Sequence, residues 1–127
     1  MKLNIFLVFC VTFSCVAFAQ AVVTPPSITT QPVDTTVTVG QTAKFTVTAT
    51  GTKPLSYQWT KNGVNITGAT NPSYTTPPTT LADDGSHFAA TVTNSAGSVT
   101  SNSALLTVVT PPSITTQPVD TDRKSVV

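Results

Sequence analysis

Residues 57–63 read YQWTKNG, and this stretch predicts a strand that runs into a tight turn. Leu55, Tyr57 and Trp59 alternate with polar residues, which places their side chains on one face of an extended chain. The pair Asn62-Gly63 favours the positive φ angles of a two-residue hairpin loop. We therefore expect a β-hairpin that returns through residues 64–66, with the single Trp in the core.

The same two-residue periodicity recurs on both sides of this hairpin. Residues 42–50, 88–92 and 104–108 all alternate between the two faces of an extended chain. Short alternating strands separated by turns are typical of a β-sandwich. We expect an all-β fold, a Greek-key β-sandwich of about seven short antiparallel strands. Its apolar faces carry Ala43, Phe45, Val47 and Ala49, then Phe88, Ala90 and Val92, and finally Ala104, Leu106 and Val108.

The composition agrees with this fold and excludes one class of partner. The chain has 127 residues, of which 27 are Thr and 17 are Val, and it contains no Glu. Thr and Val favour strands. Only 9% of the residues are charged and the net charge is +1, without a basic cluster. We therefore expect no nucleic-acid partner.

The first 19 residues have the layout of a secretory signal peptide. Lys2 precedes an apolar run over residues 5–18, and Ala17-Phe18-Ala19 forms a cleavage site of small residues. We expect cleavage after Ala19 and a secreted or cell-surface location. Two alternatives remain: an uncleaved anchor, for which the run is shorter than about 20 residues, and a lipoprotein acylated at Cys15. Cleavage would remove both cysteines, so we expect no disulfide in the exported domain.

An internal repeat divides the rest of the chain. Residues 24–34 read TPPSITTQPVD and recur unchanged as residues 110–120. A repeat at this spacing predicts a tandem array whose unit is one domain. We expect a signal peptide (1–19), a linker (20–25), one complete domain (26–109), and a linker with the start of a truncated second repeat (110–121). Residues 122–127 read DRKSVV, the translation of a common sequencing adapter, and we expect them to be foreign to the protein.

The motifs quoted so far resemble those of a known family. Residues 57–63 look like strand C and the C–C′ turn of an immunoglobulin-like domain. Asp83-Asp84-Gly85, followed by FAATVTNSAG at residues 88–97, resembles its E–F corner, strand F and F–G turn. The resemblance covers residues 26–109 and is similar to the I-set-like tandem modules of bacterial secreted and surface proteins. It implies the Greek-key sandwich expected above.

The chain departs from this family at three places. Val47 and Ala90 stand where the resemblance places the bridging cysteines, so apolar contact would replace the inter-sheet disulfide beside Trp59. Phe88 stands where the family has its corner tyrosine, and Gly85 is one residue out of register. These departures leave the expected fold unchanged but do not favour antibody-like recognition.

One tight cluster of titratable residues could form a site. Asp83, Asp84 and His87 admit a metal or acid–base site, or a turn in which the carboxylates accept hydrogen bonds from nearby N–H groups while His87 faces solvent. Two Asp and one His are too few ligands for a closed metal site. We favour the turn, and we assign no catalytic, cofactor-binding or metal-binding residue.

Aromatic residues offer a second candidate. Tyr57, Trp59 and Tyr74 could form a sugar-stacking platform, but the first two lie on the apolar face of their strand, so we expect them in the core and Tyr74 alone exposed. Asn65-Ile66-Thr67 matches the N-glycosylation sequon, which a bacterial source would leave unused.

These observations favour a structural or interaction module rather than an enzyme. We expect a non-catalytic unit of an exported bacterial multi-domain protein that acts as spacer, display or adhesion domain. The alternative is an accessory module, with carbohydrate binding as one role, of a secreted hydrolase whose catalytic domain lies elsewhere. Expected partners are an unidentified protein or glycan and neighbouring immunoglobulin-like repeats, and no cofactor is expected.

Overall fold

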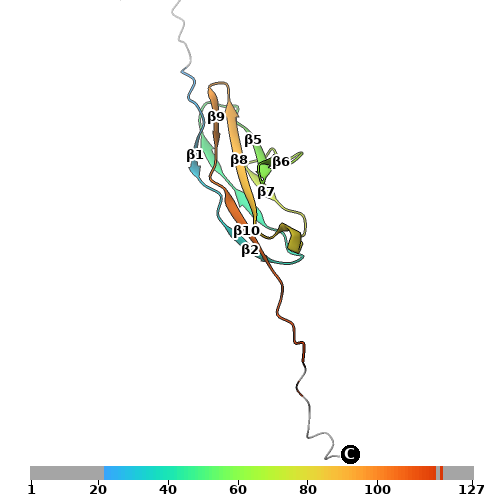
Figure 1. Ribbon diagram of the computed structural model, residues 1–127. Helices are drawn as coiled ribbons and strands as arrows, with labels where there is room; N and C mark the ends of the chain where they lie inside the picture. Colours follow the sequence, from blue (N-terminus) through green and yellow to red (C-terminus); the bar gives the residue numbers. More distant parts are fainter. Residues whose placement is uncertain (1–21, 117, 119–127) are drawn as a thin grey trace, which may run out of the picture.

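Ten strands and one short 3-10 turn make up the described part of the chain, residues 22–116 and 118 of a computed structural model (Figure 1). The predicted signal peptide (1–19) and the predicted foreign tail (122–127) lie outside these residues. No helix in the described ranges is long and apolar enough to cross a membrane. The elements are β1 (Ser27–Thr30), β2 (Thr35–Thr38), β3 (Lys44–Thr46), β4 (Thr48–Thr50), β5 (Ser56–Lys61), β6 (Val64–Asn65), β7 (Ser73–Thr75), η1 (Leu81–Asp83), β8 (Ser86–Asn94), β9 (Gly97–Thr100) and β10 (Ala104–Val109).

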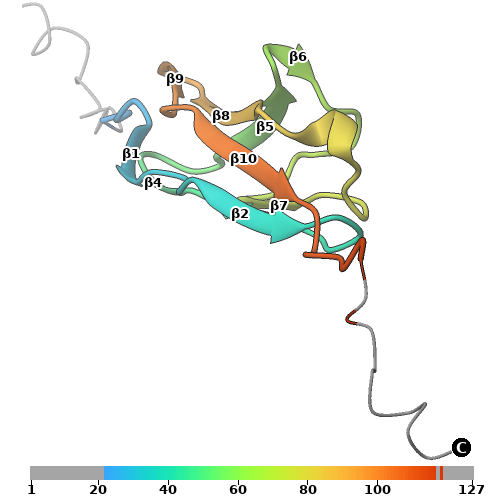
Figure 2. The ribbon, with the colours of Figure 1, turned by 60° about the horizontal axis from the view of Figure 1, so that its bottom comes forward.

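The strands form two layers, as predicted for a sandwich (Figure 2). One layer is a six-stranded sheet with the order β2-β10-β8-β5-β6, in which β9 also pairs with β8. The opposite layer consists of the pairs β1–β4 and β3–β7. Residues from both layers share one hydrophobic cluster, which lies between them.

The prediction of about seven antiparallel strands was wrong in two details. First, β2 runs parallel to β10, with Thr35 opposite Leu106. The chain changes layers between β1 and β2, where Pro32 is buried. Second, the run predicted for residues 42–50 is divided at Val47, because β3 pairs with β7 while β4 pairs with β1. The Val47 N–H donates instead to the Pro72 carbonyl, 3.0 Å away.

The predicted apolar faces are confirmed. In the run before the hairpin, Ala49 is half-buried and the other three predicted residues are buried. Alternation therefore holds through Val47 even where the ladder is interrupted. The buried members are Ala43, Phe45, Val47, Phe88, Ala90, Val92, Ala104, Leu106 and Val108.

Four aromatic rings fill the centre of this core. Phe45 and Tyr74 face each other across the β3–β7 pair, while Trp59 and Phe88 come from the six-stranded sheet. The Phe45 and Phe88 ring centroids are 4.7 Å apart and the Tyr74 and Phe88 centroids 5.8 Å. Trp59 lies 6.4 Å from both Phe45 and Tyr74. The four residues form a closed aromatic cluster that joins the two layers.

The hairpin predicted from YQWTKNG is confirmed. Lys61 pairs with Val64, and the two loop residues have φ angles of 51° at Asn62 and 83° at Gly63. Trp59 is 0% exposed, and its indole Nε1–H donates to the Asn71 carbonyl at 2.9 Å. The ring is therefore buried without leaving its polar atom unsatisfied.

The aromatic cluster predicts a large loss of stability on truncation. We expect Phe88→Ala to lower the free energy of unfolding by about 3–5 kcal/mol, because it removes ring contacts to both layers and leaves a cavity. Val64→Ala, at a side chain that is 70% exposed, is the control and should cost less than about 0.5 kcal/mol. Urea titration followed by Trp fluorescence measures both. Equal losses in the two variants would contradict this role of the cluster.

Candidate functional site

Asp83, Asp84 and His87 do not converge on a common point. Asp83 ends η1 and faces Lys61, Asp84 points toward β10, and His87 is exposed on β8. No group of three His, Cys, Asp or Glu side chains that could hold a metal ion occurs among residues 22–116 and 118. The alternative of a metal or acid–base site therefore has no support in the geometry of these three residues.

Asp83 closes the short turn that precedes β8. Its Oδ1 forms an ion pair with the Lys61 ammonium, at the end of β5, and its Oδ2 accepts a hydrogen bond from the Thr80 N–H at 2.9 Å. The hydrogen bond from Lys61, followed by that from Thr80, lowers the pKa of Asp83 below its ordinary value. The ion pair therefore connects η1 to β5, the first strand of the hairpin.

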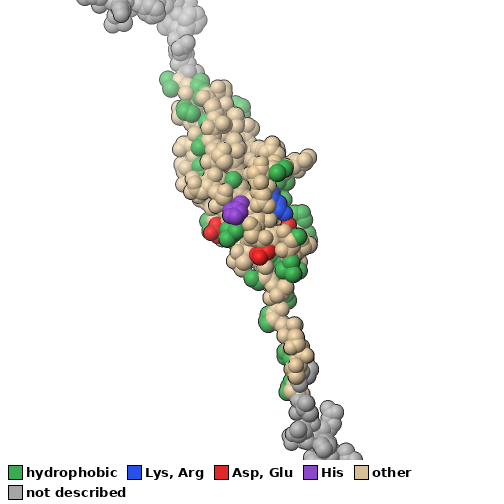
Figure 3. Space-filling view, viewed as in Figure 1, with side chains coloured by type: hydrophobic (Ala, Val, Ile, Leu, Met, Phe, Trp, Pro, Cys, Tyr) green, Lys and Arg blue, Asp and Glu red, His purple; other side chains and the backbone are tan. Residues whose placement is uncertain are grey.

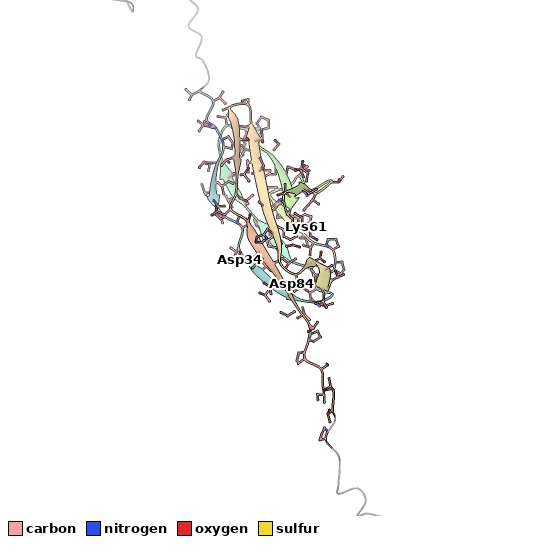
Figure 4. The ribbon with its side chains drawn as sticks, in the orientation of Figure 1. Asp34, Lys61 and Asp84 are labelled. Carbon is pink, nitrogen blue, oxygen red and sulfur yellow. The ribbon has the colours of Figure 1, made fainter. Side chains whose placement is uncertain are left out.

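Asp84 acts on the neighbouring strand. Its Oδ1 accepts a hydrogen bond from the Val108 N–H at 2.8 Å, while the Gly85 N–H donates to the Leu106 carbonyl at 2.9 Å. Asp34, which precedes β2, accepts from the Leu105 N–H at 2.8 Å. Asp34, Lys61 and Asp84 come from three different segments of the chain and lie in the same half of the domain (Figure 4). The predicted turn, in which carboxylates accept hydrogen bonds from nearby main-chain N–H groups, is confirmed for Asp83. The donor to Asp84 instead lies on β10, 24 residues away in sequence.

Charge is sparse over the face in Figure 3. The charged side chains and the His in view lie in the half of the domain nearer the end of β10, and the other half is covered mainly by uncharged polar groups and backbone. His87 is exposed, as predicted, and its N–H donates to the Asn62 side-chain oxygen at 2.9 Å. This bond links the main chain of β8 to the hairpin loop.

The aromatic residues do not form a sugar platform. Trp59 is buried and Tyr57 is half-buried against the core, as predicted. The prediction that Tyr74 is exposed was wrong, because its ring is half-buried and packs on Phe88 and Trp59. Asn65 of the sequon is exposed on β6.

A polar cluster near the entry of the chain was not predicted. The Thr24 N–H donates to Thr52 Oγ1 at 2.7 Å, and the Thr52 N–H donates to the Thr24 carbonyl at 3.1 Å. Asn94 Nδ2 donates to the carbonyls of Thr24 (2.7 Å) and Thr52 (3.0 Å). A Cβ on Gly51, whose φ is +140°, would lie 3.0 Å from Pro26 Cα. We call Gly51, Thr52 and Asn94 the entry clamp.

The entry clamp left one signal in the sequence. Its target, Thr24-Pro25-Pro26, begins the repeated segment, and this recurrence is the feature of the sequence that marks the segment. Its partners lie far away in sequence, and nothing in the local pattern around Asn94 identifies them. The clamp also shows that the end of the predicted linker, residues 24–25, is bound to the domain.

The Lys61–Asp83 pair predicts a pH-dependent contribution to stability. We expect Asp83→Asn to lower the free energy of unfolding at pH 7 by up to about 1 kcal/mol, as for a partly exposed ion pair. Since folding lowers the pKa of Asp83, the contribution is complete above the carboxyl pKa of the unfolded chain and disappears as the pH falls through that of the folded chain. Urea titrations of both proteins from pH 7 to pH 2 measure this difference. A difference that persists undiminished at pH 2 would contradict the ion pair as its source.

Comparison with known proteins places this geometry in a family. A profile of the immunoglobulin domain family matches residues 25–105. Endoglucanase C of Cellulomonas fimi is 37% identical over 107 residues, which cover 80% of this chain but only 10% of that enzyme. Titin of Drosophila melanogaster is 50% identical over 42 residues, 33% of this chain and a share of titin that rounds to 0%.

Solved structures agree with the family profile. Titin domain M7 has a TM-score of 0.61 at 35% identity, covering 69% of this chain and 97% of that domain. The immunoglobulin domains 1–5 of Sidekick-1 have a TM-score of 0.62 at 25% identity, covering 71% of this chain and 21% of theirs. The two-layer arrangement, the buried Trp59 and the profile match lead to one conclusion. The chain belongs to the immunoglobulin domain family.

Proposed function

We propose that this chain supplies a non-catalytic immunoglobulin-like module to an exported bacterial multi-domain protein, where it spaces and displays its neighbours. The observation that carries the proposal is the path of the chain, which enters the sandwich at one end and leaves from the opposite end (Figure 1). Such a path suits a unit that holds two neighbours apart. The recurrence of residues 24–34 as residues 110–120 supports further immunoglobulin-like repeats as those neighbours.

The use of the polar side chains supports a non-catalytic role. Within the described ranges, Asp34, Asp83 and Asp84 are all occupied by main-chain N–H groups or by Lys61. A catalytic carboxylate or nucleophile needs a neighbouring base or acid and access to substrate. These three carboxylates instead stabilise turns and strands of the fold.

A second candidate is an accessory unit of a secreted polysaccharide hydrolase. The similarity to endoglucanase C, which extends over 80% of this chain, favours this context. Because the chain spans only 10% of that enzyme, the similarity concerns a small part of it. A complete reading frame that encodes a hydrolase domain would favour this candidate, and one that encodes repeats and a surface anchor would favour the first.

Export predicts a defined amino terminus. We expect the chain, expressed in a bacterial host, to be recovered outside the cytoplasm beginning at Gln20, because signal peptidase requires small residues at its cleavage site. Ala19→Leu should remain unprocessed, whereas the matched change Ala21→Leu, outside the A-x-A site, should not. Intact-protein mass spectrometry measures this. Recovery of the full-length chain in the cytoplasm would contradict export.

Glycan retention separates the spacer from a carbohydrate-binding accessory unit. All aromatic side chains of the described part are buried or half-buried, so we expect no ring platform and no retention on insoluble cellulose, chitin or xylan. Pull-down against each glycan, with an established cellulose-binding protein as positive control, measures retention. Retention by any of the three would overturn the pure spacer function and favour the second candidate.

A further inference from the structure

We propose that successive units of this protein join without a flexible linker, because the residue after the last strand of one unit is the first residue held by the next. The proposal rests on the tandem arrangement in the proposed function. It assigns an interaction surface, the entry clamp, and a partner for it, the end of the preceding unit.

The preceding unit holds its chain up to Val109. This residue ends β10, where it pairs with Thr38 of β2, and its carbonyl accepts a hydrogen bond from the Val39 N–H at 2.9 Å. The next residue in the sequence is Thr110, with which the second copy of the repeated segment begins.

The first copy of that segment is held from its first residue. The main chain of Thr24 takes part in three hydrogen bonds. Its N–H donates to Thr52 Oγ1 at 2.7 Å, and its carbonyl accepts from the Thr52 N–H at 3.1 Å and from Asn94 Nδ2 at 2.7 Å. Because residues 110–120 repeat residues 24–34 without change, a following unit of the same sequence would hold Thr110 through the same atoms. No residue would remain between the two attachments.

The second copy exposes the side chains that the first copy covers. Pro26 is buried beside Gly51, and Ile28 is half-buried in the β1–β4 pair. Their counterparts Pro112 and Ile114 are exposed, with Ile114 68% exposed. The same apolar side chains therefore lack in the second copy the covering surface they have in the first. That surface consists of an entry clamp and a strand equivalent to β4, which a following unit would supply.

The ends of the domain are placed for such a junction. Asn94 of the entry clamp ends β8, which runs antiparallel to β10, so the ends of these two strands lie at opposite ends of the sandwich (Figure 1). Units joined from Val109 to Thr110 would then follow one another end to end. The direction of β10 would fix the orientation of the next unit, since no flexible residue separates them.

The test uses a two-unit version of the chain that begins at Gln20 and so contains no native cysteine, in which a second copy of residues 24–109 follows Val109. Both junctions then keep their natural sequence. Val64→Cys in each unit, at an exposed position of β6, carries a spin label, and double electron–electron resonance gives the distribution of inter-label distances. A reference chain with eight Gly/Ser residues between Val109 and Thr110 adds a flexible linker of about 16 Å root-mean-square span.

We expect a narrow distribution for the two-unit chain and one several-fold broader for the reference chain. Asn94→Ala in the second unit alone should broaden the distribution toward the reference, because it removes the hydrogen bond to the Thr110 carbonyl. Asn102→Ala in the same unit is the matched control and should not, since the hydrogen bonds of Asn102 come from its main chain. A two-unit chain as broad as the reference would overturn the proposal.

Hydrogen exchange supplies a readout that does not depend on a variant. The Thr110 N–H should be protected in the two-unit chain and should lose that protection in the 127-residue chain, where no second clamp follows. Equal exchange in both proteins would overturn the proposal. If the chain were not exported, or if it bound glycans, the proposed function would be contradicted. Both junction measurements would be unchanged.

Discussion

The packing of four aromatic rings between the two layers is the interaction on which the sandwich depends. Phe45 and Tyr74 lie on one layer, Trp59 and Phe88 on the other, and each ring contacts two of the others. Loss of a native disulfide typically costs about 2–5 kcal/mol. Since Val47 and Ala90 occupy the positions that the family resemblance gives to the bridging cysteines, apolar packing takes the place of a disulfide between the layers. Each ring buries roughly 150–250 Å², enough apolar surface to supply energies of that size.

Local pattern was sufficient to predict the parts of the fold that depend on neighbours in sequence. Alternation identified the buried face of every long strand, and Asn62-Gly63 identified the hairpin with both φ angles positive. The interruption at Val47 was not predictable in this way. It arises because β3 and β4 pair with different strands, and the side chain of Val47 remains on the same face throughout. Periodicity reports side-chain direction, whereas hydrogen-bond partners depend on distant segments.

The same distinction applies to the candidate site. The sequence predicted that Asp83 and Asp84 would accept hydrogen bonds in a turn, but not that Lys61 or the Val108 N–H would be among the donors. Tyr74 was expected to be exposed because, of the three candidate aromatic residues, only Tyr57 and Trp59 lie on the apolar face of an alternating strand. Its ring is covered by Trp59 and Phe88, which come from strands distant from Tyr74 in the sequence. Long-range contacts therefore decided the surroundings of Asp83, Asp84 and Tyr74, which the local sequence pattern did not determine.

Two of the charged side chains in the described part of the chain act on β10. Asp34 accepts from the Leu105 N–H and Asp84 from the Val108 N–H, so carboxylates from two different loops fix this strand near both ends. Hydrogen bonds to a charged acceptor are stronger than neutral ones. β10 also pairs with β2 on one side and β8 on the other, and it is the strand from which the chain leaves the domain. In a spacer, the last strand of one unit determines the direction of the next unit. A strand that is paired on both sides and bonded to two carboxylates would keep that direction nearly constant.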